Sequence, residues 1–179
     1  MNLSPTLDIC SLEELIHRLN IPSKKNQFYY NQLIQSLEIS LASVKSYCTW
    51  KQESYTRNLV HRTDLYELLI LCWQKGQASP IHDHQGQDCW MCVVEGTIEE
   101  TVYHPTNDNS KNLILSKSDR IIYDRGDKSY LTNSNAEWHS IQPLSDRAIT
   151  LHLYSLPIEK CRVYDLKTAQ LSERHLNYS

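Results

Sequence analysis

The stretch from Gly76 to Gly96, GQASPIHDHQGQDCWMCVVEG, constrains the chain most strongly, because it places two histidines two residues apart in a run typical of β-strand. Side chains at positions i and i+2 of a strand point to the same face. His82 and His84 are therefore predicted to project together, while Asp83 points away. Two converging imidazoles supply two ligands of a metal site, so a third ligand must come from elsewhere in the chain.

From Tyr55 onwards the sequence has the two-residue periodicity of β-strands, interrupted by Gly, Pro, Asn and Ser residues that favour turns. Many short strands following an N-terminal helical segment predict a mainly β protein, an all-β barrel or double-stranded jelly roll. The strands are expected at residues 55–62, 65–74, 89–96, 97–104, 112–116, 119–126, 128–133 and 148–156.

Two helices are predicted before the strands. Residues 11–20 have the capping-box spacing of Ser11 and Glu14, and Pro22 ends this segment. A second helical pattern covers roughly residues 26–46. One apolar face recurs along each helix, so both are expected to pack on the outside of the barrel; its members are Leu12, Leu15, Ile16 and Leu19 in the first helix, and Leu33, Ile34, Leu37, Leu41 and Val44 in the second.

Length and composition bound the possible functions. A chain of 179 residues fits one domain, which is predicted to comprise a helical cap (1–50), a β-barrel (51–165) and a C-terminal tail (166–179). The net charge of −3 and the lack of a basic block argue against a nucleic-acid partner. No apolar run reaches the ~18 residues that span a bilayer. Without a recognisable signal sequence, a cytoplasmic monomer whose six cysteines stay reduced is expected.

His139, in SNAEWHSIQP, is the candidate for the third metal ligand. Three neutral imidazoles suit Fe(II), Zn, Cu or Ni, so the ligand type does not choose the metal. Because no carboxylate joins them, such a site keeps the full charge of a divalent metal. It therefore favours an anionic ligand, and a thiolate is well suited because a metal holds a thiol deprotonated.

Arg57 lies two residues from Tyr55 on a predicted strand, so the two side chains share a face. An arginine of this kind has two interpretations. It either pairs with an acidic residue at the barrel rim or binds the carboxylate of a substrate through two parallel hydrogen bonds. The spacing leaves both open.

Thr150, His152 and Tyr154 alternate onto one face of the last predicted strand. They form either a polar ladder on a solvated face or, if the face points inward, a relay that holds Tyr154 beside the metal. Cys89 and Cys92 are three apart on a strand, so they are predicted to face opposite sides, with Cys89 on the metal side. Neither a disulfide nor a zinc knuckle is expected from this pair, and Cys92 is expected in the core with Cys48 and Cys72. His61, His104 and His175 are expected at the surface, and His17 is expected to be a surface or packing residue.

The spacing from Gly76 through His82, His84 and Cys89 to Gly96 resembles the first cupin motif, with cysteine where most cupins carry a glutamate ligand. Taken with further stretches, the region from about Tyr55 to Cys161 resembles the mammalian-type cysteine dioxygenases. The matching stretches are YTRNLV (55–60), LILCW (69–73), SPIHDHQGQDCW (79–90), EGTIEETVY (95–103) and LHLYS (151–155). The resemblance implies a cupin double-stranded β-helix.

The resemblance also implies a reaction. Members of this family hold Fe(II) with three histidines, here His82, His84 and His139, and convert L-cysteine and O2 to cysteine sulfinic acid. By this analogy Arg57 pairs with the substrate carboxylate and Tyr55 supports it. Relatives that act on 3-mercaptopropionate carry glutamine at the position of Arg57, so the arginine favours cysteine.

In the same family Tyr154 would hydrogen-bond near the substrate or oxygen, steadied by His152, and Cys89 would form a thioether with Tyr154. Two further readings remain open: a dioxygenase for another small thiol, and a cupin that binds metal without turnover. The joint presence of Arg57, Cys89 and Tyr154 favours the enzyme.

Some positions depart from the family pattern. Thr150 replaces a serine, and the segment before His139 has one extra residue. In that segment Ser134 and Ala136 replace the usual proline and glycine, and Trp138 replaces a smaller apolar residue. Leu156 replaces a proline that follows a cis peptide bond in the family. The Ser155–Leu156 bond is therefore predicted to be either trans or a strained cis bond.

Overall fold

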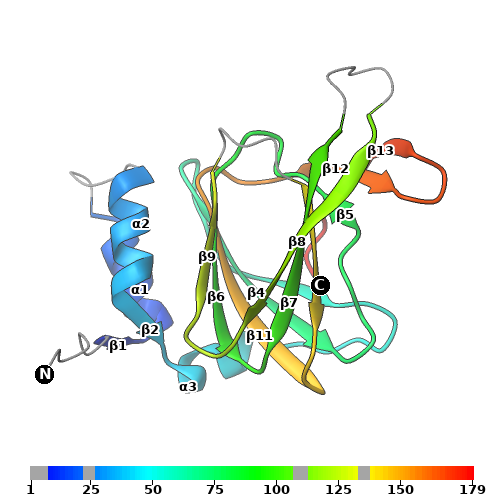
Figure 1. Ribbon diagram of the computed structural model, residues 1–179. Helices are drawn as coiled ribbons and strands as arrows, with labels where there is room; N and C mark the ends of the chain where they lie inside the picture. Colours follow the sequence, from blue (N-terminus) through cyan, green and yellow to red (C-terminus); the bar gives the residue numbers. More distant parts are fainter. Residues whose placement is uncertain (1–7, 22–26, 107–112, 133–137) are drawn as a thin grey trace, which may run out of the picture.

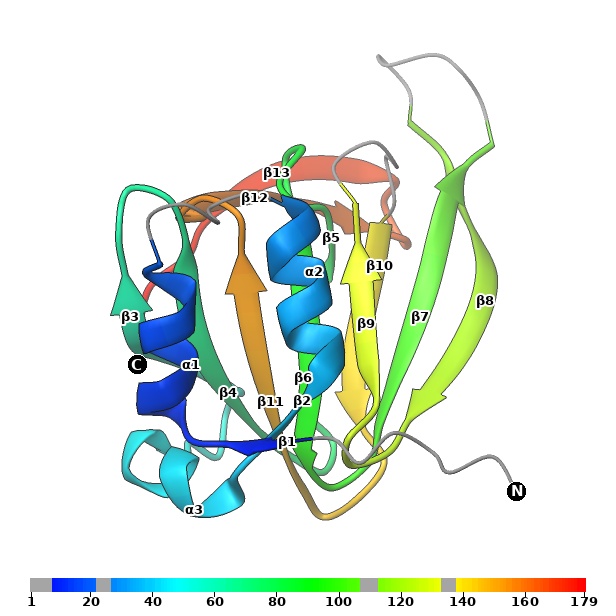
Figure 2. The same ribbon diagram turned by 90° about the vertical axis from the view of Figure 1, so that its left-hand side faces the viewer.

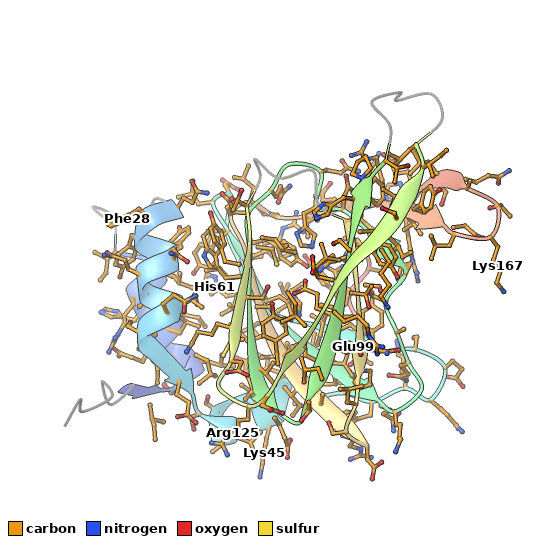
Figure 3. All side chains as sticks on the ribbon, in the orientation of Figure 1. Phe28, Lys45, His61, Glu99, Arg125 and Lys167 are labelled. Atoms are coloured by element: carbon orange, nitrogen blue, oxygen red, sulfur yellow. The ribbon has the colours of Figure 1, made fainter. Side chains whose placement is uncertain are left out.

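The computed structural model describes residues 8–21, 27–106, 113–132 and 138–179. Two antiparallel sheets face each other, and the helices lie against the outer side of one of them (Figures 1 and 2). Side chains fill the space between the sheets (Figure 3). The predicted double-stranded β-helix with helices packed outside is confirmed. No helix in the described ranges is long and apolar enough to span a membrane.

The N-terminal region contains more than the two predicted helices. Helix α1 (Leu12–Leu19) begins after Ser11, whose hydroxyl accepts a hydrogen bond from the Glu14 backbone as the capping-box spacing predicted. Helix α2 (Gln27–Ser36) ends well before residue 46, so the predicted single helix is wrong at residues 37–40, whereas residues 41–46 are helical again. Strand β2 (Leu37–Ile39) pairs in parallel with β1 (Asp8–Cys10), followed by α3 (Leu41–Val44) and the short 3-10 helix η2 (Lys45–Tyr47). Pro22 lies outside the described residues.

The five-stranded sheet carries the helices on its outer face. Its strands are, in spatial order, β3 (Thr56–Arg62), β4 (Glu67–Gln74), β11 (Arg147–Tyr154), β6 (Cys89–Glu95) and β9 (Lys128–Leu131). The six-stranded sheet opposite consists of β13 (Gln170–His175), β12 (Lys160–Asp165), β5 (Ile81–His82), β10 (Trp138–Pro143), β7 (Ile98–Pro105) and β8 (Leu115–Tyr123).

Strand β4 shows how the alternation of side chains divides the interior. Seven of its eight residues are buried, because the sheet is covered on both faces. Leu68 and Ile70 belong to the core beneath the helices, whereas Leu69 and Leu71 belong to the core between the sheets. Figure 2 shows α1 and α2 in front of this sheet. The barrel wall therefore has an apolar outer face, and its inner face is free to carry the site.

Two strand predictions and the predicted tail need correction. The predicted strands 112–116 and 119–126 form one strand, β8, which begins only at Leu115; residue 112 is not described. The segment 166–179 is not a tail separate from the barrel, because it contains β13, which pairs along its whole length with β12. Its last residue returns to the other sheet: the Ser179 backbone N–H donates to the Arg57 carbonyl at 2.9 Å, and the C-terminus lies beside β3 (Figure 2).

Candidate metal centre

Three histidines converge between the sheets. His82 ends strand β5 and lies opposite His139 of β10, while His84 lies two residues after the end of β5. Their ring centroids are 4.5–5.4 Å apart, and the Nε2 atoms of His84 and His139 are separated by 3.1 Å. Candidate ligand atoms of all three lie within 4.8 Å of one another. Two nitrogens bound at ~2.1 Å to one metal would be about 3 Å apart at a right angle, so the cluster fits a metal ion.

Neighbouring groups orient these imidazoles. The Nδ1 atom of His82 is 3.0 Å from the Pro80 carbonyl oxygen, and Nδ1 of His139 is 2.5 Å from Glu100 Oε1. When each Nδ1–H donates to its oxygen, the Nε2 atom is left for a metal, the arrangement usual for ligating histidines. Asp83 points away, as predicted, and pairs with Arg162.

Glu100 is the polar residue of this site that the sequence analysis missed. It is 2% exposed and shares a face of β7 with Ile98 and Val102, so an acid in an otherwise apolar strand row was the available signal. Burial alone would raise the pKa of Glu100, but hydrogen bonds from His139 and from nearby hydroxyls, together with the charge of His139, hold that pKa below its usual value. The site therefore contains one carboxylate, which contacts a histidine.

The histidines are electrostatically prepared to bind metal. Burial, followed by repulsion from His139, lowers the pKa of His82 to about 3, and the same causes place the pKa of His84 well below its ordinary value. Both imidazoles are therefore neutral at physiological pH, which is the form that binds metals.

The three histidines line a cavity between the two sheets. Arg57 lines this cavity as well and is 7% exposed. Neither of its terminal guanidinium nitrogens forms a hydrogen bond with the described residues. The interpretation of a rim arginine paired with an acid is therefore wrong for the described part of the chain. An unpaired buried cation is costly, so this cavity suits an anionic ligand. Tyr55 lies beside it and stacks on Trp73, with ring centroids 4.3 Å apart.

The ladder of polar groups on β11 points inward. The Trp73 indole N–H donates to Thr150 Oγ1 at 2.9 Å, and that oxygen is 2.9 Å from His152 Nε2. If the hydroxyl donates to Nε2, the proton on His152 Nδ1 faces Cys89 Sγ, 3.9 Å away. His152 therefore contacts Cys89, and its ring lies nearly parallel to that of Tyr154 with centroids 6.3 Å apart.

Cys89 and Tyr154 are direct partners in the pairing of β6 with β11, and their side chains interact. Burial raises the pKa of the Cys89 thiol and of the Tyr154 phenol, so both are protonated at neutral pH. The Tyr154 ring meets His84 edge-on, with centroids 5.4 Å apart. Cys92 lies in the core under the helices, confirming that the two cysteines face opposite sides, and all six cysteines are free.

The departures from the family pattern have limited effects on the site. The described residues contain no cis peptide bond, so Ser155–Leu156 is trans, and Tyr154 nevertheless stays beside His84. Trp138 packs against Tyr164 and does not line the cavity. Ser134 and Ala136 lie outside the described residues. Elsewhere, His17, His104 and His175 are exposed as expected, whereas His61 is half-buried against Tyr66.

A three-histidine centre inside a double-stranded β-helix defines a metal-binding cupin. The model of the family described as cysteine dioxygenase type I matches residues 6–167, and the chain belongs to this family. It is 30% identical to cysteine dioxygenase type 1 of Bos taurus over 163 residues, which cover 89% of this chain and 80% of the relative. The Homo sapiens protein of the same name is 29% identical with the same coverage.

One solved structure supports the fold alone. The crystal structure of TT1209 from Thermus thermophilus superposes with a TM-score of 0.51 at 16% identity, covering 63% of this chain and 93% of that one.

Proposed function

We propose that this protein is an Fe(II)-dependent dioxygenase that converts L-cysteine and O2 to cysteine sulfinic acid. The observation that carries the proposal is the buried guanidinium of Arg57, unpaired among the described residues, in the same cavity as the three-histidine cluster. A thiol that also bears a carboxylate satisfies both features at once. Membership of the cysteine dioxygenase type I family supports the choice of cysteine.

His82, His84 and His139 would hold the iron, which, when bound, would coordinate the substrate thiolate and activate O2. Three neutral ligands fit this chemistry, because they leave the charge of the metal for an anionic sulfur. Arg57 would bind the carboxylate in two parallel hydrogen bonds and so fix the orientation of the substrate. The phenol of Tyr154 stays protonated because burial raises its pKa, so it would donate a hydrogen bond beside His84.

We also propose that Cys89 and Tyr154 form a thioether. Their placement as cross-strand partners supports this crosslink. The new bond would join the cysteine sulfur to a ring carbon, with O2 as oxidant accepting the hydrogen atoms of the thiol and of that carbon. Mass spectrometry of the digested protein after aerobic turnover should find the two peptides joined and lighter by two hydrogen atoms. Separate peptides after many turnovers would exclude the crosslink.

The proposed reaction is tested by anaerobic reconstitution with Fe(II), followed by O2 uptake with L-cysteine, 3-mercaptopropionate and cysteamine. Uptake with cysteine in a one-to-one ratio with sulfinic acid formed is expected. Cysteamine lacks the carboxylate that Arg57 would bind and should react poorly. Uptake with 3-mercaptopropionate but not with cysteine would favour the second candidate, a dioxygenase for other small thiols. Bound iron without any uptake would leave a non-catalytic metal-binding cupin.

The protein is further proposed to work as a cytoplasmic monomer with a single domain. Six free cysteines, five of them buried, support a reducing compartment. Sedimentation equilibrium should give the mass of one chain, 20.9 kDa.

A further inference from the structure

A second arginine, Arg174, lies at the mouth of the cavity that holds the histidines. It is on β13, directly opposite Cys161 of β12, and both residues line this inner cavity. Within the described residues, the Arg174 side chain forms no hydrogen bond and no ion pair. The proposed oxidation of cysteine gives it no role, since the single carboxylate of cysteine is taken by Arg57.

Arg174 lies between two adjoining cavities whose linings contain further cationic side chains. The inner cavity adjoins an outer cavity, and Tyr55, Arg57, Arg174 and Leu176 line both. Lys51 adds a third cation to the outer cavity, and neither lining contains Asp or Glu among the described residues. Ser179, the last residue of the chain, also lines the outer cavity, whereas the inner cavity presents Arg57 and Arg174 with no carboxylate among its lining residues.

The two guanidinium groups act on the same part of the cavity wall. Burial raises the pKa of Tyr55, and the charges of Arg57 and Arg174 both oppose this increase. The pKa of Cys161 rises to about 11 through burial and the nearby Asp83, again with both arginines opposing. Arg57 and Arg174 therefore both act electrostatically on the same two side chains, and both line the inner and the outer cavity.

We propose that Arg174 recognises a second anionic group, so that the pocket binds small thiols carrying two carboxylates more tightly than the same thiols carrying one. The inference rests on the proposed function for the thiol at the metal and the first carboxylate at Arg57. The second carboxylate would receive charge-assisted hydrogen bonds from Arg174 at the cavity mouth.

The test compares two thiols that differ by one carboxylate, mercaptosuccinate and 3-mercaptopropionate. Their dissociation constants are measured by calorimetry on the Fe(II)-loaded protein without O2. Wild type should bind mercaptosuccinate at least about fivefold more tightly, the size expected for one partly exposed charge-assisted contact. Arg174→Gln should bring the ratio of the two constants close to one, and Arg174→Lys should give an intermediate ratio because it keeps the charge without the planar fork.

Lys167→Gln is the matched control. Lys167 lies at the far tip of the β12–β13 hairpin, directed away from the barrel (Figure 3), so this variant removes an equal charge from the same hairpin. Its ratio should equal that of wild type. If Lys167→Gln lowers the ratio as much as Arg174→Gln does, overall charge explains the preference and the inference is wrong.

Failure of the inference and failure of the proposed function give different results. Equal binding of the two thiols by a wild-type protein that oxidises cysteine would overturn only the inference. If the protein bound neither thiol and did not oxidise cysteine, the proposed function would fall. In that case succinate against propionate, the same pair without sulfur, still tests Arg174, and a preference for succinate that Arg174→Gln abolishes would uphold it as an anion site.

Discussion

The two faces of the five-stranded sheet are built from the same strands but have different roles, one in packing and the other in the candidate site. On β11, Leu151 and Leu153 point outward into the core under the helices, whereas His152 and Tyr154 line the cavity and Thr150 contacts His152. On this strand the outward-facing residues are apolar, and the inward-facing residues carry hydroxyl, imidazole and phenol groups. Because neighbouring positions alternate, a substitution one residue along the strand should move the effect from stability to chemistry.

The comparison is tested most strongly by Leu151→Ala on the outer face. Leu151 is fully buried, so truncation should lower the free energy of unfolding by about 2–5 kcal/mol through lost burial and the cavity left behind. Urea unfolding measures this loss. The iron content and the dissociation constant for cysteine of the folded variant should be unchanged, because the side chain does not reach the site.

Leu156→Ala serves as the control, since Leu156 is 49% exposed and should cost little. Loss of iron from folded Leu151→Ala would mean that the two faces are not separable.

Arg57→Gln, on the inner side of β3, is expected to reduce activity without lowering the free energy of unfolding. Loss of the charge-assisted pair with the substrate carboxylate should reduce kcat/KM for L-cysteine by ~10–100-fold. The free energy of unfolding should not fall, because both terminal nitrogens lack partners among the described residues and the variant removes a desolvated charge. Steady-state kinetics and urea unfolding of the same preparation check both parts.

Arg57→Lys separates charge from geometry, and it should recover only part of the lost kcat/KM because a lysine cannot form the two parallel bonds. A marked loss of stability in Arg57→Gln would show that the guanidinium is a structural group.

The sequence predicted the inner face better than the edges of the sheets. Period-two patterns located β3, β4, β6, β7 and β11, and in β4, β6 and β11 neighbouring residues alternate between two buried cores. They failed for β13, all of whose residues are exposed, and divided the mostly exposed β8 into two strands, because a strand held by backbone hydrogen bonds at an edge needs no apolar pattern. In the N-terminal region, Leu37 and Ile39 fit a strand as well as a helical repeat, and the pairing with β1 decides between them.

The same reason explains which site residues were missed. His82, His84 and Cys89 lie within one continuous stretch, so their spacing is visible in the sequence. Glu100 and Arg174 reach the site only because β7 pairs with β10 and β13 pairs with β12. Neither pairing can be derived from the local pattern, since the order of strands in a sheet is a long-range property.

Glu100 extends the comparison to the opposite sheet, where a polar residue again points inward. Glu100→Gln should weaken Fe(II) binding by about tenfold, and by up to about 100-fold, because the carboxylate no longer orients and polarises His139. Competition with a metal-binding dye under anaerobic conditions measures the affinity. Glu99, its neighbour on β7, pairs with the exposed Arg120 outside the site, so Glu99→Gln is the matched control. Unchanged affinity in Glu100→Gln would assign the residue to packing alone.

The smallest expected effect concerns pH and again contrasts the two faces. Burial, then the charges of His139 and Arg57, lowers the pKa of His152 to about 3 in the folded protein. The unfolded chain, with a histidine pKa of about 6.5, binds a proton that the folded state excludes, so stability is lost as pH falls from about 6.5 towards 3. Between pH 7 and pH 5 the metal-free protein should lose about 1–2 kcal/mol through His152.

His152→Gln removes this proton and should flatten the pH dependence of urea unfolding by that amount, whereas Leu151→Ala, one residue away on the outer face, should lower stability equally at both pH values. Parallel losses in all three proteins would mean that His152 titrates alike in the folded and unfolded states. Its burial and its contacts with Thr150 and Cys89 would then not keep the imidazole neutral in the folded protein. The polar residues of the inner face would in that case contribute no more to the pH dependence of stability than the apolar residues of the outer face.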